Sequence, residues 1–238
     1  MHQILFIFDI AILCANIKEN TIERRFSMIN INNYTFQDLV EKHGIQSAER
    51  LAYIDFLLRF TGKLRRSDIT SFFGLGDAAA SKEISNYKAQ KEGNVEYDRV
   101  LRRNEILRET YQPLVDIDAT SALGMLANGF NKTKLQHRPI IPYSRVGNSS
   151  KILDVDLVSK VTRAISSKNI IKCYYMSGSS SNHGERTLTP TTIFFDGISW
   201  MFRAFHRESN EFKCFNFSRL KAVTECPLDF AKNNETIE

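Results

Sequence analysis

The chain has 238 residues, of which 42% are apolar and 25% are charged, with 32 Lys and Arg against 27 Asp and Glu. These fractions are typical of a soluble globular protein and exclude collagen-like, coiled-coil and predominantly disordered chains. The net charge of +5 is a mild basic excess that permits a polyanionic partner. Since Cys14, Cys173, Cys214 and Cys226 form no Cys-x-x-Cys pair, we expect reduced thiols in a cytoplasmic protein.

Residues 1–27 form a leader that stands apart from the rest of the chain. An apolar run over residues 4–15 is interrupted by Asp9 and is shorter than the roughly 18–20 residues of a transmembrane helix, so we expect no membrane anchor. The run also lacks the basic start of a secretory signal. Three interpretations stay open: a weak signal-like segment, a buried strand or helix, and a start assigned too early, with Met28 as the initiator.

A first amphipathic helix is expected over residues 47–60, within a winged helix-turn-helix domain that spans residues 28–110. Apolar side chains recur there at helical spacing, Ser47 can cap the helix, and Gly62 stops it. The inward-facing residues of this helix are expected to be Leu51, Ile54, Leu57 and Leu58.

Two shorter helices are expected next. The second has Ser67 as its cap candidate and ends at Gly74, and the third begins near Asp77 and ends before Gly93. Two short helices joined by a glycine-containing turn are the geometry of a DNA-binding helix-turn-helix. The inward-facing residues of the second helix are expected to be Ile69, Phe72 and Phe73.

DNA contacts are expected from the third helix and from a basic hairpin, the wing, that follows it. Small side chains at the helix start would let it enter a major groove, and the wing would grip phosphates. A plainer interpretation also fits the pattern: a three-helix packing unit with a solvated charged face. The expected DNA-binding residues are Arg65, Arg66, Ser67, Ala79, Ser81, Lys82, Ser85, Asn86, Lys88, Arg99, Arg102 and Arg103.

Residues 111–150 are expected to be a linker, because they contain three prolines and show no long periodicity. A sensing domain over residues 151–228 follows, and it begins with an amphipathic helix over residues 154–168. The apolar period then changes from about 3.6 to about 2, which predicts four to five short strands in a small antiparallel barrel or strongly bent sheet. Pro190 indicates an edge or a bulge in the second strand. Residues 229–238 would be a tail.

Several short pieces of the second half occur together in a fixed order. They are Tyr174, Tyr175, Ser177 and Ser179, then Arg186 to Pro190, Asp196 to Trp200, Arg203 to Phe205, and Phe217 to Leu220. With these pieces, the segment from Lys168 to Glu225 resembles a WYL domain. Through residues 50–76, 78–87 and 93–99, the first half resembles the winged helix-turn-helix of the BrxR/CapW-like branch of WYL-domain transcriptional regulators, which are repressors encoded beside bacterial anti-phage systems. The chain departs from the family where Met201 follows Trp200, and from the resemblance we expect it to lack most of the C-terminal extension of that branch.

The resemblance implies a sensor pocket for a nucleotide or single-stranded nucleic acid on an Sm-like barrel. Arginine suits bidentate phosphate binding, and aromatic faces can stack on bases. Core aromatics and surface charges are the plainer interpretation of the same residues. The expected ligand-binding residues are Tyr174, Ser177, Ser179, Arg186, Trp200, Arg203, His206 and Arg219.

We therefore expect an α+β protein with an N-terminal winged helix-turn-helix followed by a small Sm-like antiparallel β-barrel. The expected function is that of a sequence-specific DNA-binding transcriptional repressor, a homodimer on operator DNA. The alternative is a nucleic-acid-binding effector or processing protein that acts through the barrel on RNA or single-stranded DNA. No catalytic residue, metal or cofactor is expected, because the chain has no nucleophile elbow, zinc-binding His-Glu-x-x-His or phosphate loop.

Overall fold

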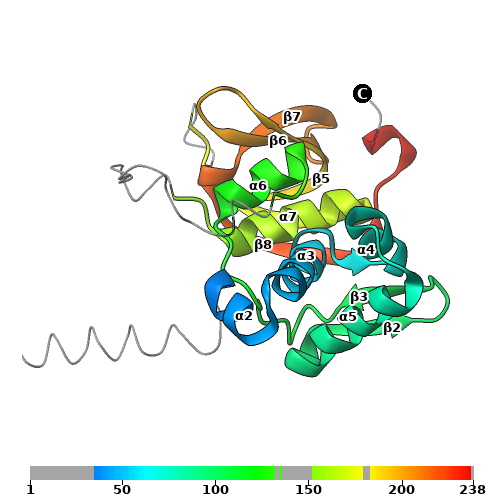
Figure 1. The fold of residues 1–238 in the computed structure, drawn as a ribbon. Helices are drawn as coiled ribbons and strands as arrows, with labels where there is room; N and C mark the ends of the chain where they lie inside the picture. The colour runs from blue at the N-terminus through cyan, green and yellow to red at the C-terminus, as the bar shows by residue number, and fades with distance from the viewer. Residues whose placement is uncertain (1–34, 132–134, 136–151, 179–182, 237–238) are drawn as a thin grey trace, which may run out of the picture. The chain divides into compact units, whose positions relative to one another are not determined.

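The computed structural model describes residues 35–131, 135, 152–178 and 183–236. The expected leader, the alternative start at Met28, Cys14, Ser179 and most of the second half of the expected linker lie outside the described residues. The described residues contain a helical N-terminal region and a five-stranded antiparallel sheet (Figure 1). The α+β class and the order of its two parts are therefore as predicted.

The N-terminal region has the element order of a winged helix-turn-helix. Its three short strands form one sheet in the order β1-β3-β2, and the β2–β3 hairpin is the wing. The elements are α2 (Phe36–His43), α3 (Ile45–Thr61), β1 (Lys63–Leu64), α4 (Arg66–Phe73), α5 (Asp77–Gln90), η1 (Glu92–Asn94), β2 (Val95–Asp98) and β3 (Arg103–Ile106).

The helices end where predicted but begin earlier than their predicted caps. Gly62 and Gly74 both have positive φ, at 79° and 65°, which ends α3 and α4 in the left-handed conformation that glycine adopts without strain. The predicted caps Ser47 and Ser67 lie inside α3 and α4. At α4, the backbone N–H of Arg65 instead donates to Asp68 Oδ2 at 2.7 Å, so an acidic residue in the first turn organises the helix start.

Phe72 does not face inward, contrary to the prediction. Its side chain is 46% exposed and stacks on Tyr53, with ring centroids 4.4 Å apart. Ile69 of the same helix is fully buried, and Phe73 packs at the edge of the core. The short helix therefore buries a narrower face than its spacing of apolar residues indicated.

A buried carboxylate, Asp55 of α3, connects α3 and α5 to the segment that follows the wing. Asp55 Oδ1 accepts hydrogen bonds from the hydroxyls of Tyr87 at 2.7 Å and Tyr111 at 2.8 Å. Its Oδ2 accepts from the backbone N–H groups of Leu114 at 3.0 Å and Val115 at 3.2 Å. Burial raises the pKa of Asp55, and these hydrogen bonds oppose the rise.

Part of the expected linker packs into the helical core. Leu114, Val115 and Ile117 are buried, and α6 (Ala119–Asn128) buries Leu123 and Met125. Asp118 caps α6 by accepting from the N–H groups of Thr120 and Ser121, each at 3.0 Å.

The C-terminal sheet has the order β7-β6-β5-β4-β8, with every neighbouring pair antiparallel. Pro190 lies at a bulge, because β5 shifts register against β6 between Pro190 and Thr192. In the described part of the chain, β7 and β8 form no strand pair, so closure of the expected barrel is not observed. The elements are α7 (Val155–Ser167), β4 (Asn169–Tyr175), β5 (Gly184–Phe195), β6 (Trp200–His206), β7 (Glu211–Asn216), η4 (Phe217–Arg219), β8 (Leu220–Phe230) and η5 (Asn233–Glu235).

Replacing Asp55 by alanine should lower the free energy of unfolding by about 3 kcal/mol, because it leaves buried hydroxyl and N–H donors without an acceptor. Urea denaturation measures the change. Asp116→Ala removes a carboxylate from an exposed position of the adjoining segment and is the matched control, with an expected change of about 0.5 kcal/mol or less. Equal stability of the two variants would contradict the role given to Asp55.

Candidate nucleic-acid interface and sensor pocket

A groove of about 460 Å³ separates α5 from the wing. Five of the predicted DNA-binding residues line it, and they come from α4, α5 and the wing hairpin. The structure thus brings together side chains that are as many as 36 positions apart in the sequence, between Arg66 and Arg102. The lining residues are Arg66, Ser81, Ile84, Ser85, Lys88, Tyr97, Arg102 and Asn104.

Helix and strand periodicity explain why these side chains meet. Ser81, Ser85 and Lys88 are four and three residues apart, so they share one face of α5, whereas Ala80 and Tyr87 are buried on another. On the wing, Tyr97 and Asn104 are a cross-strand pair and turn the same face toward the groove.

Asn104 is a buried polar residue at this groove. It is 4% exposed, and its Nδ2 donates to the carbonyl of Leu64 at 3.4 Å. Its Oδ1 has no hydrogen-bond partner among the described residues. An unsatisfied buried acceptor costs about 1–3 kcal/mol, which a donor in the groove would recover. The prediction from sequence did not include Asn104, although its place opposite Tyr97 follows from the hairpin register.

The other predicted DNA-binding residues do not line the groove. Asn86 lies on the side of α5 that faces α3, where its Nδ2 donates to Ser47 Oγ at 3.4 Å. Arg103 forms an ion pair with Glu105, and strand alternation turns both away from Tyr97 and Asn104. The remaining predicted residues are exposed to solvent, and they are Arg65, Ser67, Ala79, Lys82 and Arg99.

A second cavity, also about 460 Å³, lies at the end of the C-terminal sheet. Two predicted ligand-binding residues, Trp200 and Arg219, line it. Phe195 pairs with Trp200 across the β5–β6 hairpin, with ring centroids 5.3 Å apart. We call this cavity the Trp200 pocket, and its lining is Thr120, Leu153, Phe195, Ile198, Ser199, Trp200, Asn216, Ser218 and Arg219.

The loop after β4 lies against Arg219 of this pocket. The N–H of Met176 donates to the carbonyl of Arg219 at 3.0 Å, and a Cβ on Gly178 would collide with the Arg219 guanidinium. Ser177, another predicted ligand-binding residue, is therefore held between two residues that contact Arg219. Glycine at position 178 leaves room for the guanidinium beside the backbone.

The remaining predicted ligand-binding residues lie elsewhere on the sheet. The pKa of His206 is lowered mainly by burial. The positive charge of Arg186 lies close enough to lower it further. Arg203 Nη1 donates to Cys214 Sγ at 3.3 Å, and its guanidinium lies over the Phe212 ring. Tyr174 is exposed on the opposite face of β4 from Cys173. The seven predicted residues that the structure describes therefore do not form one site.

Sequence reasoning missed several members of the Trp200 pocket. Phe195 could have been found, because a short turn after it makes it the partner of Trp200. Ser218 lies within the matching piece from Phe217 to Leu220 and Asn216 lies two residues before Ser218, but neither was predicted as a ligand-binding residue. Thr120 comes from α6 and Leu153 from just before α7, so only the tertiary structure places them here.

The two regions meet at a buried ion pair between Arg163 of α7 and Glu225 of β8. Arg163 Nη2 and Nε donate to Glu225 Oε2 at 2.6 and 3.2 Å, and Nη1 donates to the carbonyl of Arg59 in α3 at 2.8 Å. Arg108, which follows the wing, also donates to Glu225, at 3.3 Å. Arg163 and Glu225 thus connect α3, α7, β8 and the base of the wing.

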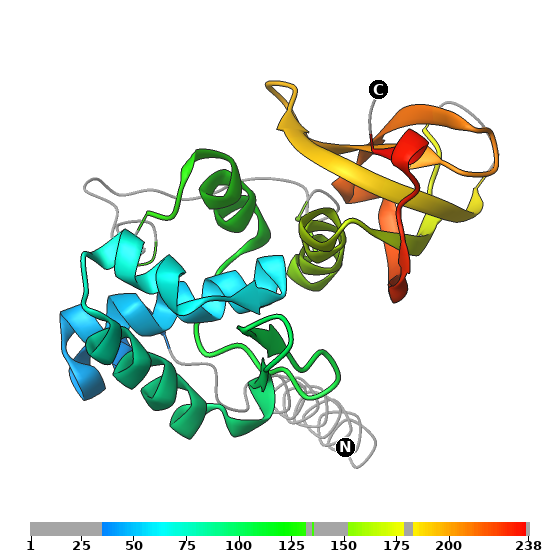
Figure 2. The same ribbon diagram turned by 90° about the vertical axis from the view of Figure 1, so that its right-hand side faces the viewer.

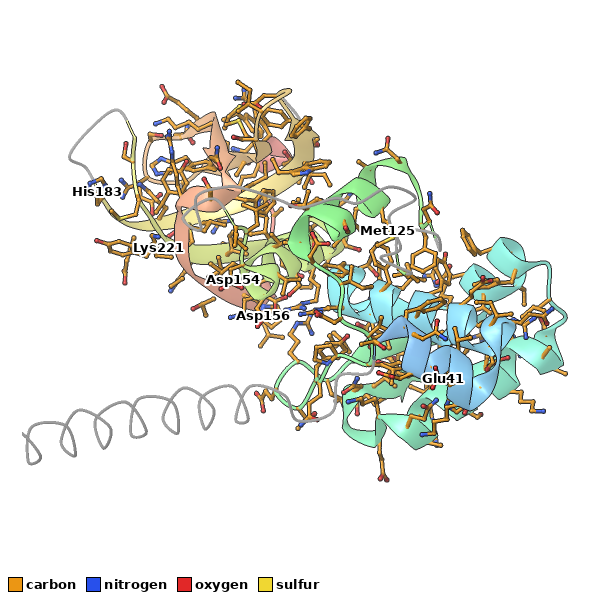
Figure 3. The ribbon with its side chains drawn as sticks, turned by 60° about the vertical axis from the view of Figure 1, so that its left-hand side comes forward. Glu41, Met125, Asp154, Asp156, His183 and Lys221 are labelled. Atoms are coloured by element: carbon orange, nitrogen blue, oxygen red, sulfur yellow. The ribbon has the colours of Figure 1, made fainter. Side chains whose placement is uncertain are left out.

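Further polar contacts support this junction. Arg59 Nη2 forms an ion pair with Asp156 Oδ1 at 3.1 Å, and Figure 3 labels Asp156 in the first turn of α7. Lys63 Nζ donates to the carbonyl of Ser166 at 2.7 Å near the other end of α7. Figures 1 and 2 show α7 beside the sheet, and these bonds attach both of its ends to the helical region.

Other kinds of site are not observed in the described residues. They contain no group of three or more His, Cys, Asp or Glu side chains that could hold a metal ion. Within the same residues, no helix is both long and apolar enough to cross a membrane. Cys173 is buried, and this burial raises the pKa of its thiol to about 12, as expected for an unreactive core cysteine.

The fold and the groove define a winged helix-turn-helix joined to a five-stranded antiparallel sheet domain. Residues 46–128 match the winged helix-turn-helix domain of the BrxR transcriptional regulator, and residues 156–225 match the WYL domain. The chain therefore carries a BrxR-type winged helix-turn-helix followed by a WYL domain.

Similar proteins are described as the DNA-binding transcriptional repressor CapW. The chain is 32% identical to CapW of Escherichia coli (strain KTE188) over 198 residues, which cover 78% of this chain and 63% of that protein. It is 32% identical to CapW of Pseudomonas aeruginosa over 185 residues, which cover 72% of this chain and 59% of that protein. The chain thus spans about three fifths of the length of these relatives.

Replacing Glu225 by glutamine should lower the free energy of unfolding by about 2–3 kcal/mol, because it leaves the charge of Arg163 buried without a counter-charge while keeping one acceptor. Denaturation in urea measures the loss. Glu211→Gln removes the same charge from an exposed ion pair with Lys213 and should change stability by less than about 1 kcal/mol. A similar small effect of both substitutions would show that the junction does not depend on this pair.

Proposed function

We propose that this protein is a transcriptional repressor that binds operator DNA in the groove between α5 and the wing. The observation that carries the proposal is the convergence of Arg66, Lys88 and Arg102 with the hydroxyls of Ser81 and Ser85 along one groove. Cationic side chains neutralise phosphates, and short polar side chains on a helix can approach base edges. The similarity to the CapW repressors supports the same function.

The groove residues divide into two roles under this proposal. Lys88 and Arg102 contact phosphates from opposite sides of the groove, and Arg66 does so from the start of α4, where it also pairs with Asp77 at 2.9 Å. Ser81 and Ser85 approach the bases from the same face of α5, where the Ser85 hydroxyl donates to the carbonyl of Ser81 at 3.0 Å. The exposed cations Arg65, Lys82 and Arg99 add to phosphate binding, and Asn86 acts indirectly by positioning α5 on α3.

We propose further that the protein binds as a homodimer. A two-fold dimer would place two copies of α5 in successive major grooves of an inverted repeat, about 34–36 Å apart. The same geometry is what a winged helix-turn-helix needs for high specificity, since one copy contacts only a short half-site.

The Trp200 pocket is the proposed sensor site for a nucleotide or single-stranded nucleic acid. Trp200 and Phe195 offer stacking faces, and Arg219 with Ser218 offers phosphate donors, on a sheet that we expect to curve as an Sm-like barrel. Thr120 lies in the segment matched to the winged helix-turn-helix, so a ligand here would contact both domains. A ligand that prefers one arrangement of the two domains would shift the protein toward it.

Replacing Lys88 or Arg102 by alanine should weaken binding to all duplexes alike. It should also reduce the slope of the logarithm of the binding constant against the logarithm of the salt concentration by about 1, because each substitution removes one contact with a phosphate. Fluorescence anisotropy across a salt series measures both effects, with duplexes selected from a random pool by the full chain. Lys172→Ala removes an exposed positive charge from β4 and is the matched control. An unchanged salt slope for both groove variants would contradict the assignment of the groove.

Adding a short single-stranded oligonucleotide should release the selected duplex, and Arg219→Ala should raise the oligonucleotide concentration that is needed by about tenfold or more. Arg186→Ala is the comparison, because Arg186 lies outside the Trp200 pocket. If Arg186→Ala abolishes release and Arg219→Ala does not, the ligand binds near His206 instead. Tight binding of the single strand without preference for any duplex would favour an effector or processing function over a repressor.

A further inference from the structure

The tip of the wing exposes two aliphatic side chains between two arginines. Val100 is 90% exposed and Leu101 is 48% exposed, and the four-residue tip begins with Arg99 and ends with Arg102. Tyr97, on the strand that leads into the tip, is also exposed and lines the groove. A wing that contacted only phosphates would need the arginines but not this apolar pair.

The backbone of the tip is held in one conformation. Asp98 Oδ1 accepts hydrogen bonds from the N–H of Val100 at 2.7 Å and from the N–H of Leu101 at 2.9 Å. Arg102 then takes a left-handed φ of 50°, which reverses the chain into β3. Because the turn is fixed at both ends, Val100 projects almost fully into solvent and Leu101 beside it stays about half exposed.

We propose that Val100 and Leu101 form an apolar wedge that enters the minor groove and partly unstacks a base step. This inference rests on the proposed DNA-binding function. Arg99 and Arg102 would hold the phosphates on either side while the wedge displaces the stacked bases. Pyrimidine–purine steps unstack most easily, so the wedge would prefer operators that carry such a step beneath the wing, without any hydrogen bond to the bases.

The charges around the tip favour DNA over a protein partner. An apolar protein surface that covered Val100 and Leu101 would also bury Arg99 and Arg102, and buried charges without partners are costly. A DNA duplex offers apolar base faces between two rows of phosphates, which matches an aliphatic pair between two arginines. Arg102 also lines the groove, so the tip continues the proposed DNA-binding surface.

The test is the bend angle of a selected duplex labelled at both ends, measured by energy transfer with the full chain bound. The native protein should kink the duplex, within the range of about 20–90° seen for side-chain wedges. The double variant Val100→Ser, Leu101→Ser should lose most of the bend, bind about tenfold more weakly, and lose its preference for a pyrimidine–purine step. Both side chains are exposed, so the variant should fold normally.

Leu228→Ser is the matched control, because Leu228 is 89% exposed on β8 and lies in neither the groove nor the Trp200 pocket. It should leave both bend and affinity unchanged. An unbent duplex with the native protein, or an equal bend with the double variant, would overturn the wedge while leaving DNA binding intact. Failure of the native protein to select any duplex would instead overturn the proposed function together with the wedge.

Discussion

The buried ion pair between Arg163 and Glu225 is the centre of the polar junction between the two halves of the described chain, because Arg163 also donates to Arg59 and Glu225 also accepts from Arg108. One guanidinium satisfies a carboxylate on β8, a backbone carbonyl on α3 and the Ser159 hydroxyl on its own helix. Since both charged groups are largely buried, removing either one would leave the other as an uncompensated buried charge, which would lower the free energy of unfolding. The helical region and the sheet are therefore constrained by a few directional bonds, which can hold one arrangement of the two elements more strictly than apolar packing alone.

This constraint has a consequence for how the proposed sensor could act on DNA. Arg219 immediately precedes β8, and Glu225 lies six residues further along the chain, within that strand. Glu225 also accepts from Arg108, which follows the wing strand β3. A ligand that displaced Arg219 would thus act on a strand already attached to both α3 and the wing. Thr120 offers a second route, because α6 lines the Trp200 pocket and belongs to the helical core.

The structure brings more of the predicted DNA-binding residues together at one site than of the predicted ligand-binding residues, for a physical reason. Ser81, Ser85 and Lys88 lie on one helix, so periodicity alone places them on a common face, and the short hairpin brings Arg102 back beside them. The predicted ligand-binding residues that the structure describes are spread over β4, β5, β6, the loop after β4 and η4. Whether such residues face one another depends on strand register, bulges and sheet curvature. The bulge at Pro190 illustrates this, because it shifts the alternation of β5 against β6 and so alters which side chains share a face.

The sequence by itself determined the class of the protein, the order of its elements and the residue types available for phosphate and base contacts. Apolar spacing, glycines at helix ends and the motifs of the WYL domain are local patterns, so they can be recognised in the sequence without knowledge of the tertiary structure. Only the tertiary structure decided that Asn86 faces Ser47, that Arg103 turns away from the groove, and that Thr120 joins Trp200 and Arg219 at one pocket. These outcomes depend on long-range packing and on buried partners such as Asp55 and Arg163, whose pairing no short stretch of sequence specifies.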